Sequence, residues 1–236
     1  LGCKVNQYET EALREVFEKN GWTCGSFSEV CDAYVINTCT VTAVSDRKSR
    51  QIIRRAVKLN PDAVIAVCGC YSETAPEDVR KINGVDIIWG TKNKLALYEK
   101  ICEKLGLKLG VKSEDMEITC FEGKTRAVIK IEDGCDNFCS YCIIPYARGR
   151  IKSRPPEAII NECNRIASAG YKEVVLAGIH VCSYGKDINS SLIELLERLD
   201  NETTIGRIRL SSIEPNAFFD GFIPRLKKLK KLCPHF

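Results

Sequence analysis

Three closely spaced cysteines are the residues of this sequence with the most defined chemistry. Cys135, Cys139 and Cys142 follow the pattern C-x3-C-x2-C directly after a strand-like run. Three thiolates at this spacing can bind three iron atoms of a four-iron cluster, so that the fourth iron has no protein ligand. A structural zinc site would take four ligands with paired C-x2-C spacing, and the next thiols, Cys163 and Cys182, lie on a predicted helix and after another predicted strand. The spacing therefore indicates an iron–sulfur cluster with one open iron, to which a small molecule can bind.

Three further cysteines are far apart in the sequence but hold equivalent places in the predicted fold. Cys3, Cys39 and Cys70 each come at the carboxyl end of a predicted parallel strand. These ends line one edge of a sheet, where ligands bind, so the three thiolates can converge there as a second cluster site with an open position. Cys68 competes with Cys70 for a place in this site, because residues two apart in a strand share a face. The spacing alone leaves that alternative open.

The cysteine content and the amino-terminal residues bear on the compartment. The 236 residues contain 14 cysteines, and the first residues lack the basic start and apolar run of a signal peptide. No stretch approaches the roughly 20 apolar residues that span a bilayer. We therefore expect a cytoplasmic protein with no membrane partner, in which clustered thiols serve metal or redox chemistry and the others are small buried side chains. The chain does not begin with Met, and its ends resemble the end and the start of strands, so we expect a fragment of a longer protein.

Positive charge is concentrated in three runs, although the net charge is only +4. The runs lie within residues 47–58, 148–154 and 225–231. Any one of them is typical of a solvated helix face. Together they modestly favour a polyanionic substrate.

The first part of the chain alternates strand-like and helix-like segments. Helices are predicted at 8–20, 43–59, 75–82 and 92–105, and strands at 33–39, 63–68 and 86–89. The inward stripe of the second helix is predicted to comprise Val44, Ile52, Ile53, Ala56 and Val57. Continuous apolar strands separated by helices are typical of a buried parallel sheet. The predicted fold class is therefore α/β, with a doubly wound parallel-sheet domain over residues 1–105 and a linker over 106–125.

A second alternation follows in residues 126–236. Strands are predicted at 127–132, 173–178 and 207–212, and helices at 156–169, 191–199 and 222–232. These segments form three strand–helix units and the start of a fourth. A β/α barrel fits this repeat better than a second open sheet, so we expect the first half of a partial barrel.

The first cysteine motif resembles the signature of the radical S-adenosylmethionine (SAM) superfamily. In C-x3-C-x-aromatic-C, Tyr141 fills the aromatic position. The resemblance implies that the open iron chelates SAM, which one electron cleaves to methionine and a 5′-deoxyadenosyl radical. It also implies cofactor contacts at the ends of the next two strands, where Gly178, Ser211 and Glu214 match. Turn formation or helix capping explains each of these three nearly as well, and His180 lies on the same predicted edge.

The wider sequence resembles the methylthiotransferase family of radical SAM enzymes. The segments that carry the resemblance are LGCKVN at 1–6, INTCTVT at 36–42, GCY at 69–71, GR at 149–150 and SRP at 153–155. The resemblance implies that Cys3, Cys39 and Cys70 bind an auxiliary cluster, whereas Cys68 does not. The cofactors would then be two [4Fe–4S] clusters and SAM, which carry the chemistry, so no side chain is assigned as catalytic. Longer stretches, LGCKVNQYE and NTCTVTAVSDRKSR, look like the branch that modifies N6-threonylcarbamoyladenosine.

The implied activity is the addition of a methylthio group to carbon 2 of that adenosine, next to the tRNA anticodon. The implied partners are tRNA and a reductant protein such as flavodoxin or ferredoxin, and we expect a monomer. One alternative is methylthiolation of another tRNA base or of a ribosomal protein. The other is a non-catalytic metal-binding module for nucleic acid, with zinc at the cysteine sites.

Overall fold

The computed structural model describes residues 2–107, 116–121, 123–214 and 221–235, and it divides the chain into two compact units. Unit 1 comprises Leu1–Met116 with Cys139–Arg148, and unit 2 comprises Glu117–Phe138 with Gly149–Phe236. Much of the predicted linker, at 108–115 and 122, lies outside the described residues. We retain the domain boundaries at 105 and 126 as a prediction, since the units are defined by packing alone.

Unit 1 is built on a parallel sheet whose strand order is β1-β2-β3. The strands are β1 (Ala33–Thr38), β2 (Val64–Gly69) and β3 (Ile87–Ile88). β2 is buried at every position. A strand with both faces covered is apolar throughout rather than alternating, which is the pattern that the sequence shows.

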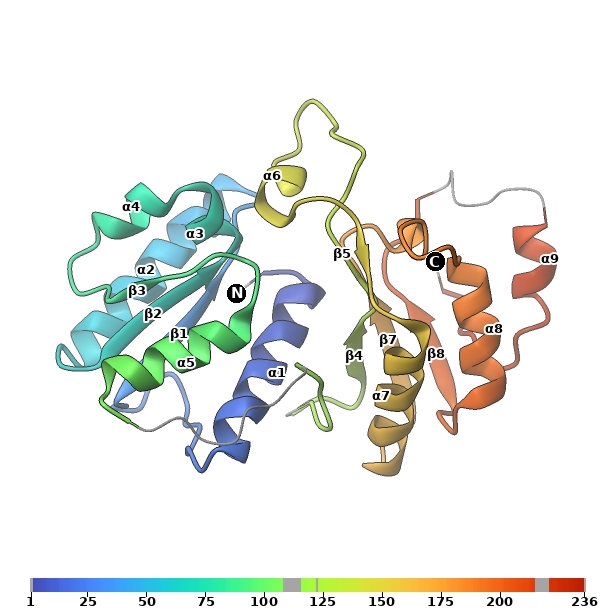
Figure 1. The fold of residues 1–236 in the computed structure, drawn as a ribbon, viewed down its shortest axis with the longest axis horizontal. Coiled ribbons are helices and arrows are strands. Elements are labelled where there is room, and N and C mark those ends of the chain that lie inside the picture. Colours follow the sequence, from blue (N-terminus) through green and yellow to red (C-terminus); the bar gives the residue numbers. More distant parts are fainter. Residues whose placement is uncertain (1, 108–115, 122, 215–220, 236) are drawn as a thin grey trace. The chain divides into compact units, whose positions relative to one another are not determined.

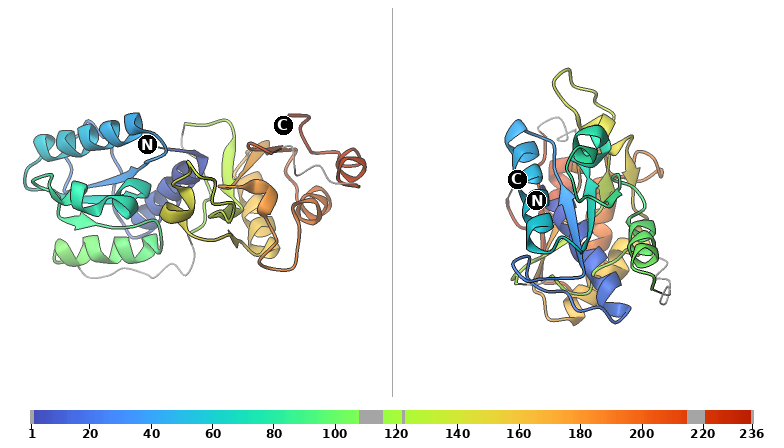
Figure 2. Two further views of the ribbon diagram at one scale, coloured as in Figure 1. Left: turned by 90° about the horizontal axis from the view of Figure 1, so that it is seen from above. Right: turned by 90° about the vertical axis from the view of Figure 1, so that its left-hand side faces the viewer.

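Helices cover both faces of this sheet (Figure 1). One core cluster joins α1 (Lys4–Lys19) and α5 (Lys94–Lys104) to the sheet, and another joins α2 (Ala43–Leu59), α3 (Cys70–Thr74) and α4 (Pro76–Arg80). Figure 2 shows α2 and α5 on opposite sides of the strands. The predicted doubly wound α/β architecture is therefore confirmed.

Two details of the helices in unit 1 differ from the sequence prediction. α1 begins at Lys4 rather than residue 8, because its buried stripe includes the polar side chain Asn6, which apolar periodicity does not register. Val44 is predicted to face inward but is 56% exposed. The buried stripe of α2 is Ser49, Ile53 and Ala56. At about 3.6 residues per turn, Val44 lies well around the helix from that stripe.

Unit 2 contains a second parallel sheet, with strand order β4-β7-β8. Its strands are β4 (Ala127–Lys130), β7 (Glu173–Ala177) and β8 (Arg207–Leu210), and α7 (Pro156–Ser168) and α8 (Leu192–Glu202) follow the first and second of them (Figure 1). α9 (Phe222–Leu226) is shorter than the predicted 222–232 helix. Beyond it, Leu232 forms a parallel bridge with Ile208 of β8. The strand–helix repeat of a partial barrel, including the start of a fourth unit, is confirmed.

Five short elements are not predicted from the sequence. They are α3 (Cys70–Thr74), β5 (Glu132–Asp133), α6 (Ile144–Arg148), β6 (Lys152–Ser153) and the 3-10 helix η1 (Val181–Ser183). β5 and β6 pair antiparallel on either side of the cysteine loop. Elements of two to five residues are too short to carry a periodic pattern.

Candidate iron–sulfur sites

The structure brings the three scattered cysteines of unit 1 together. Cys3 is the N-cap of α1, Cys39 directly follows β1, and Cys70 is the first residue of α3, directly after β2. The Cys70 thiol interacts electrostatically with both Cys3 and Cys39. Cys39 and Cys70 therefore lie at the predicted sheet edge, and the start of α1 supplies the third thiol.

Cys68 lies in other surroundings than Cys70, which favours Cys70 in the alternative that the spacing left open. Its side chain is fully buried in the core cluster beneath α1 and α5, where Lys94 Nζ lies 3.6 Å from its sulfur. The two-residue periodicity fails because the chain turns sharply at Gly69, with φ of 100°. A Cβ atom there would stand 2.5 Å from the Thr38 carbonyl oxygen, so only glycine fits the turn that separates Cys68 from Cys70.

A buried polar network surrounds the Cys70 thiol. Arg148 Nε donates to Cys70 Sγ at 3.3 Å, and the same guanidinium donates to Glu9 Oε1 at 2.5 Å and to Asn6 Oδ1 at 2.8 Å. Burial raises the pKa of the Cys70 thiol, and attraction to Arg148 partly offsets that rise. Asn6 Oδ1 also accepts a hydrogen bond from Cys3 Sγ at 3.3 Å. The polar network thus reaches two of the three thiols.

The donor set of this site fits an iron–sulfur cluster. It consists of three thiols, the ligand type that such clusters take. In the described part of the chain, no group of three or more His, Cys, Asp or Glu side chains is arranged to hold a single metal ion.

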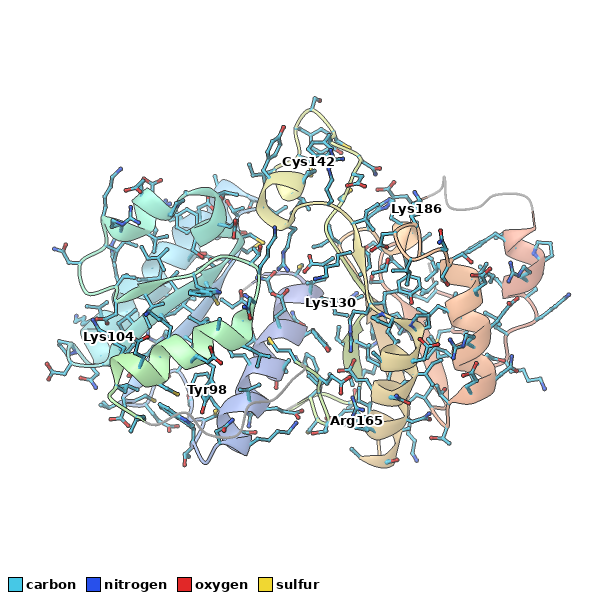
Figure 3. All side chains as sticks on the ribbon, in the orientation of Figure 1. Tyr98, Lys104, Lys130, Cys142, Arg165 and Lys186 are labelled. Atoms are coloured by element: carbon cyan, nitrogen blue, oxygen red, sulfur yellow. The ribbon has the colours of Figure 1, made fainter. Side chains whose placement is uncertain are left out.

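The closely spaced cysteines are divided between the two units. Cys139 and Cys142 belong to unit 1, where the Cys142 amide donates to the Cys139 carbonyl at 2.9 Å in a turn just before α6. Figure 3 shows Cys142 at the beginning of that helix. Cys135 belongs to unit 2, and its amide donates to the Gly149 carbonyl at 3.1 Å. Cys139 is exposed and the other two are partly exposed, which suits a cluster that must admit a cofactor.

The predicted cofactor residues fall into separate surroundings. Tyr141 is 90% exposed. Ser211 follows β8, and its amide donates to the Leu176 carbonyl at 3.0 Å, continuing the sheet ladder. Glu214 is half exposed, and its Oε2 lies 3.1 Å from Nε2 of the buried His180. The structure therefore pairs Glu214 with His180. The sequence singles out His180 because it is one of two histidines and follows a predicted strand.

His180 also lines a pocket of about 260 Å³ in unit 2. Its Nδ1 shares a hydrogen bond with the Ser183 hydroxyl of η1. Cys182 and Lys186 line the same pocket. A positively charged side chain and a buried imidazole equip this pocket for a polar or anionic ligand group.

Glu132 is a buried carboxyl group that sequence reasoning does not single out. Its Oε2 accepts the His180 amide at 2.9 Å, and a Cβ atom on Gly178 would stand 2.6 Å from the same oxygen. Burial raises the pKa of Glu132 to about 7, against the opposing effect of the backbone hydrogen bonds. Gly178, predicted as a cofactor contact, thus makes room for a carboxyl group that holds the loop after β7. No sequence signal marks Glu132, because it reads as the end of a strand.

Two of the three basic runs are engaged in internal contacts. In the second run, Arg148 is buried against Glu9, and Arg154 pairs with the buried Glu162. In the third, Arg225 pairs with Glu197, and Lys231 Nζ donates to backbone carbonyls. The exposed basic side chains of α2 are Arg47, Lys48, Arg54, Arg55 and Lys58. α2 therefore carries the most continuous basic surface of the three runs.

Comparisons with known proteins show what the two halves of the chain resemble. Residues 1–90 match the family model described as "Uncharacterized protein family UPF0004", and residues 129–236 match that of the radical SAM superfamily. A solved structure of the radical SAM methyltransferase TsrM from Kitasatospora setae covers 93% of this chain and 54% of its own length, with a TM-score of 0.64 and 16% identity. Residues 129–236, which contain Cys135, Cys139 and Cys142, thus match the radical SAM superfamily, whose members bind SAM and a [4Fe–4S] cluster, and the similarity to TsrM shows a shared fold.

Curated relatives are similar to the chain over its whole length. The threonylcarbamoyladenosine tRNA methylthiotransferase MtaB of Bacillus subtilis is 44% identical over the whole chain, and the chain covers 55% of that protein. A tRNA-2-methylthio-N(6)-dimethylallyladenosine synthase of Pelotomaculum thermopropionicum is 38% identical, with 56% of its length covered. Over its whole length the chain is thus similar to tRNA methylthiotransferases, and it spans about half the length of the curated relatives it matches.

The predicted lack of a membrane-spanning segment can be tested on part of the chain. Among the described residues, no helix is both long enough and apolar enough to cross a bilayer.

Proposed function

We propose that the protein represented by this chain transfers a methylthio group to carbon 2 of N6-threonylcarbamoyladenosine, next to the anticodon of tRNA. The observation that carries the proposal is the convergence of Cys3, Cys39 and Cys70 in the unit that also contains Cys139 and Cys142. Similarity to several threonylcarbamoyladenosine tRNA methylthiotransferases supports the substrate.

Two thiol sets would hold two [4Fe–4S] clusters in this proposal. Cys135, Cys139 and Cys142 would bind the cluster that chelates SAM, and Cys3, Cys39 and Cys70 the auxiliary cluster. When bound, the clusters and SAM supply the radical and sulfur chemistry. The side chains of the chain bind and orient these groups, and the accessible positions of Cys139 and Cys142 leave room for SAM.

The pocket beside His180 is our candidate for the polar end of SAM. The Glu214 carboxylate is placed to accept hydrogen bonds from ribose hydroxyls or from the methionyl ammonium group, with Ser211 on the neighbouring strand end. His180 Nε2, 3.1 Å from Glu214 Oε2, would hold that carboxylate in place. Glu132 would fix the backbone of the same loop through the His180 amide. Tyr141 and Gly178 stay candidates beside them.

The substrate and partners follow from the same proposal. The exposed arginines and lysines of α2 would contact the tRNA backbone. A small electron-transfer protein such as flavodoxin or ferredoxin would supply electrons. We further propose that the protein acts as a cytoplasmic monomer.

Nucleoside analysis of tRNA tests the proposal directly. The full-length protein would be expressed in a bacterial strain whose tRNA lacks methylthio groups, and its nucleosides examined by mass spectrometry. We expect 2-methylthio-N6-threonylcarbamoyladenosine to appear, and not to appear with the C135A/C139A/C142A variant. Methylthiolation of dimethylallyladenosine instead would favour the branch of the Pelotomaculum relative. Zinc in place of iron, with no 5′-deoxyadenosine formed from SAM and a reductant, would favour the non-catalytic module.

A further inference from the structure

Arg148 is a buried arginine at the end of α6, six residues after Cys142. Its side chain has no exposed surface. Arginine is rarely buried unless its donors are satisfied. The partners of this guanidinium therefore indicate its role.

The three kinds of nitrogen in the guanidinium reach three different groups of unit 1. Nε donates to Cys70 Sγ at 3.3 Å, Nη1 to Glu9 Oε1 at 2.5 Å, and Nη2 to Asn6 Oδ1 at 2.8 Å. A simple ion pair would turn two parallel donors to the carboxylate. Here one donor is aimed at a thiol instead, and Asn6 extends the network to Cys3.

Two buried cations of this network share one carboxylate. Arg148 contacts one oxygen of Glu9, and Lys94 Nζ lies 3.6 Å from the other. Both cations and the carboxylate are almost fully buried.

We propose that Arg148 is a positioning residue of the auxiliary cluster, in which its Nε–H group hydrogen-bonds the Cys70 sulfur that binds iron. The inference rests on the proposed auxiliary cluster. A donor and a positive charge next to a ligating sulfur stabilise the more negative, reduced state of a cluster, and so raise its reduction potential. The segment that carries Cys139 and Cys142 thereby also sets the electronic properties of the other site.

A redox titration of the auxiliary cluster alone tests this inference. Full-length protein with the C135A/C139A/C142A background would be reconstituted anaerobically with iron and sulfide, and its midpoint potential followed by electron paramagnetic resonance. R148K keeps a cation opposite Glu9 but removes the planar donor. We expect the equilibrium constant for reduction to fall about tenfold, which is about 59 mV for one electron. R50K makes the same change at Arg50, which donates to Tyr71 next to Cys70 in sequence, and should leave the potential unchanged.

A second variant keeps the test decisive if R148K does not fold. R148Q/E9Q removes both charges of the pair and should show the same fall in potential. If both variants bind the cluster with an unchanged potential, the role of Arg148 is refuted while the auxiliary cluster stands. If the background protein itself binds no cluster, the auxiliary cluster is refuted and the inference with it.

Discussion

Cys68 and Cys70 are separated by one glycine, yet they have different surroundings. Cys68 lies in the apolar core beside Lys94, whereas the Cys70 thiol accepts a hydrogen bond from Arg148 beyond the end of β2. The turn at Gly69 makes this difference, because it ends β2 before Cys70. At the scale of single residues, backbone conformation decides which of the two thiols lies in the core and which lies beyond the end of β2.

Alanine substitution should therefore lower the iron content at position 70 and leave it unchanged at position 68. C70A should reduce the iron content of the full-length protein from about eight to about four atoms per chain, since one of two four-iron clusters loses a ligand. C68A removes a core thiol and should keep about eight. Iron and sulfide analysis after anaerobic reconstitution measures both. Loss of a cluster from C68A alone would show that the ligand is Cys68 rather than Cys70.

The buried carboxyl group of Glu132 should make stability depend on pH. Its folded-state pKa is raised to about 7, so the folded state binds a proton that the unfolded state releases near pH 4.5. Stability from this group is thus fully present below about pH 4.5 and is lost as the pH rises toward 7, by up to about 3 kcal/mol. E132Q should remove this slope in denaturant unfolding of the apo protein. E194Q, at an exposed position of unit 2, should retain it.

The longer elements are predictable from sequence because each carries a full pattern. α2 has its buried stripe at helical spacing, and β2 is a continuous apolar run. The short α6 has no such pattern, although it carries Arg148. The contact between Arg148 and Glu9 joins residues 139 positions apart, so only the packed fold reveals it.

The candidate sites also differ in how far the sequence alone predicts them. The motif of Cys135, Cys139 and Cys142 is local, so the sequence indicates it directly. The set of Cys3, Cys39 and Cys70 needs the topology of a parallel sheet, and the choice between Cys68 and Cys70 needs the turn at Gly69 or the family resemblance. Glu132 and Arg148 escape sequence reasoning because each is defined by its partners rather than by its neighbours in sequence.

The G69A substitution tests whether the strand-to-helix turn after β2 requires glycine, because it adds one methyl group. G69A would add a Cβ atom 2.5 Å from the Thr38 carbonyl oxygen in a backbone conformation with φ of 100°. We expect a loss of about 1–3 kcal/mol of stability from crowding, in addition to the conformational strain, together with loss of auxiliary iron. G21A has a similar positive φ but no atom within 4 Å of the added Cβ. Equal losses of stability in the two variants would show that crowding at Gly69 does not matter.

At the scale of the whole molecule, fewer of the basic side chains in the three runs are free of internal ion pairs than the sequence suggests. The second and third basic runs are partly consumed by ion pairs, whereas α2 keeps five exposed basic side chains. Long-range attraction of a polyanion depends on charges that remain accessible. α2 is therefore the surface of unit 1 best suited to contact a polyanion, and in our proposal that polyanion is tRNA.

Neutralising two residues of α2 should weaken tRNA binding by the full-length protein. For R47Q/R54Q we expect a lower affinity at all salt concentrations and a salt dependence, as the slope of log K against log salt, reduced by about 1–2. K227Q/K228Q makes the same change in charge at exposed positions of the third run. A larger effect from the K227Q/K228Q variant would move the tRNA surface away from α2.

The auxiliary cluster underlies both the proposed activity and the role of Arg148, and its sharpest test is iron and sulfide analysis of the C135A/C139A/C142A variant. The variant of the full-length protein would be reconstituted anaerobically and examined by electron paramagnetic resonance. We predict about four iron and four sulfide per chain, since one four-iron cluster remains. The signal of the reduced cluster should disappear when Cys3, Cys39 and Cys70 are also replaced. A folded C135A/C139A/C142A variant that holds no iron would refute the auxiliary cluster.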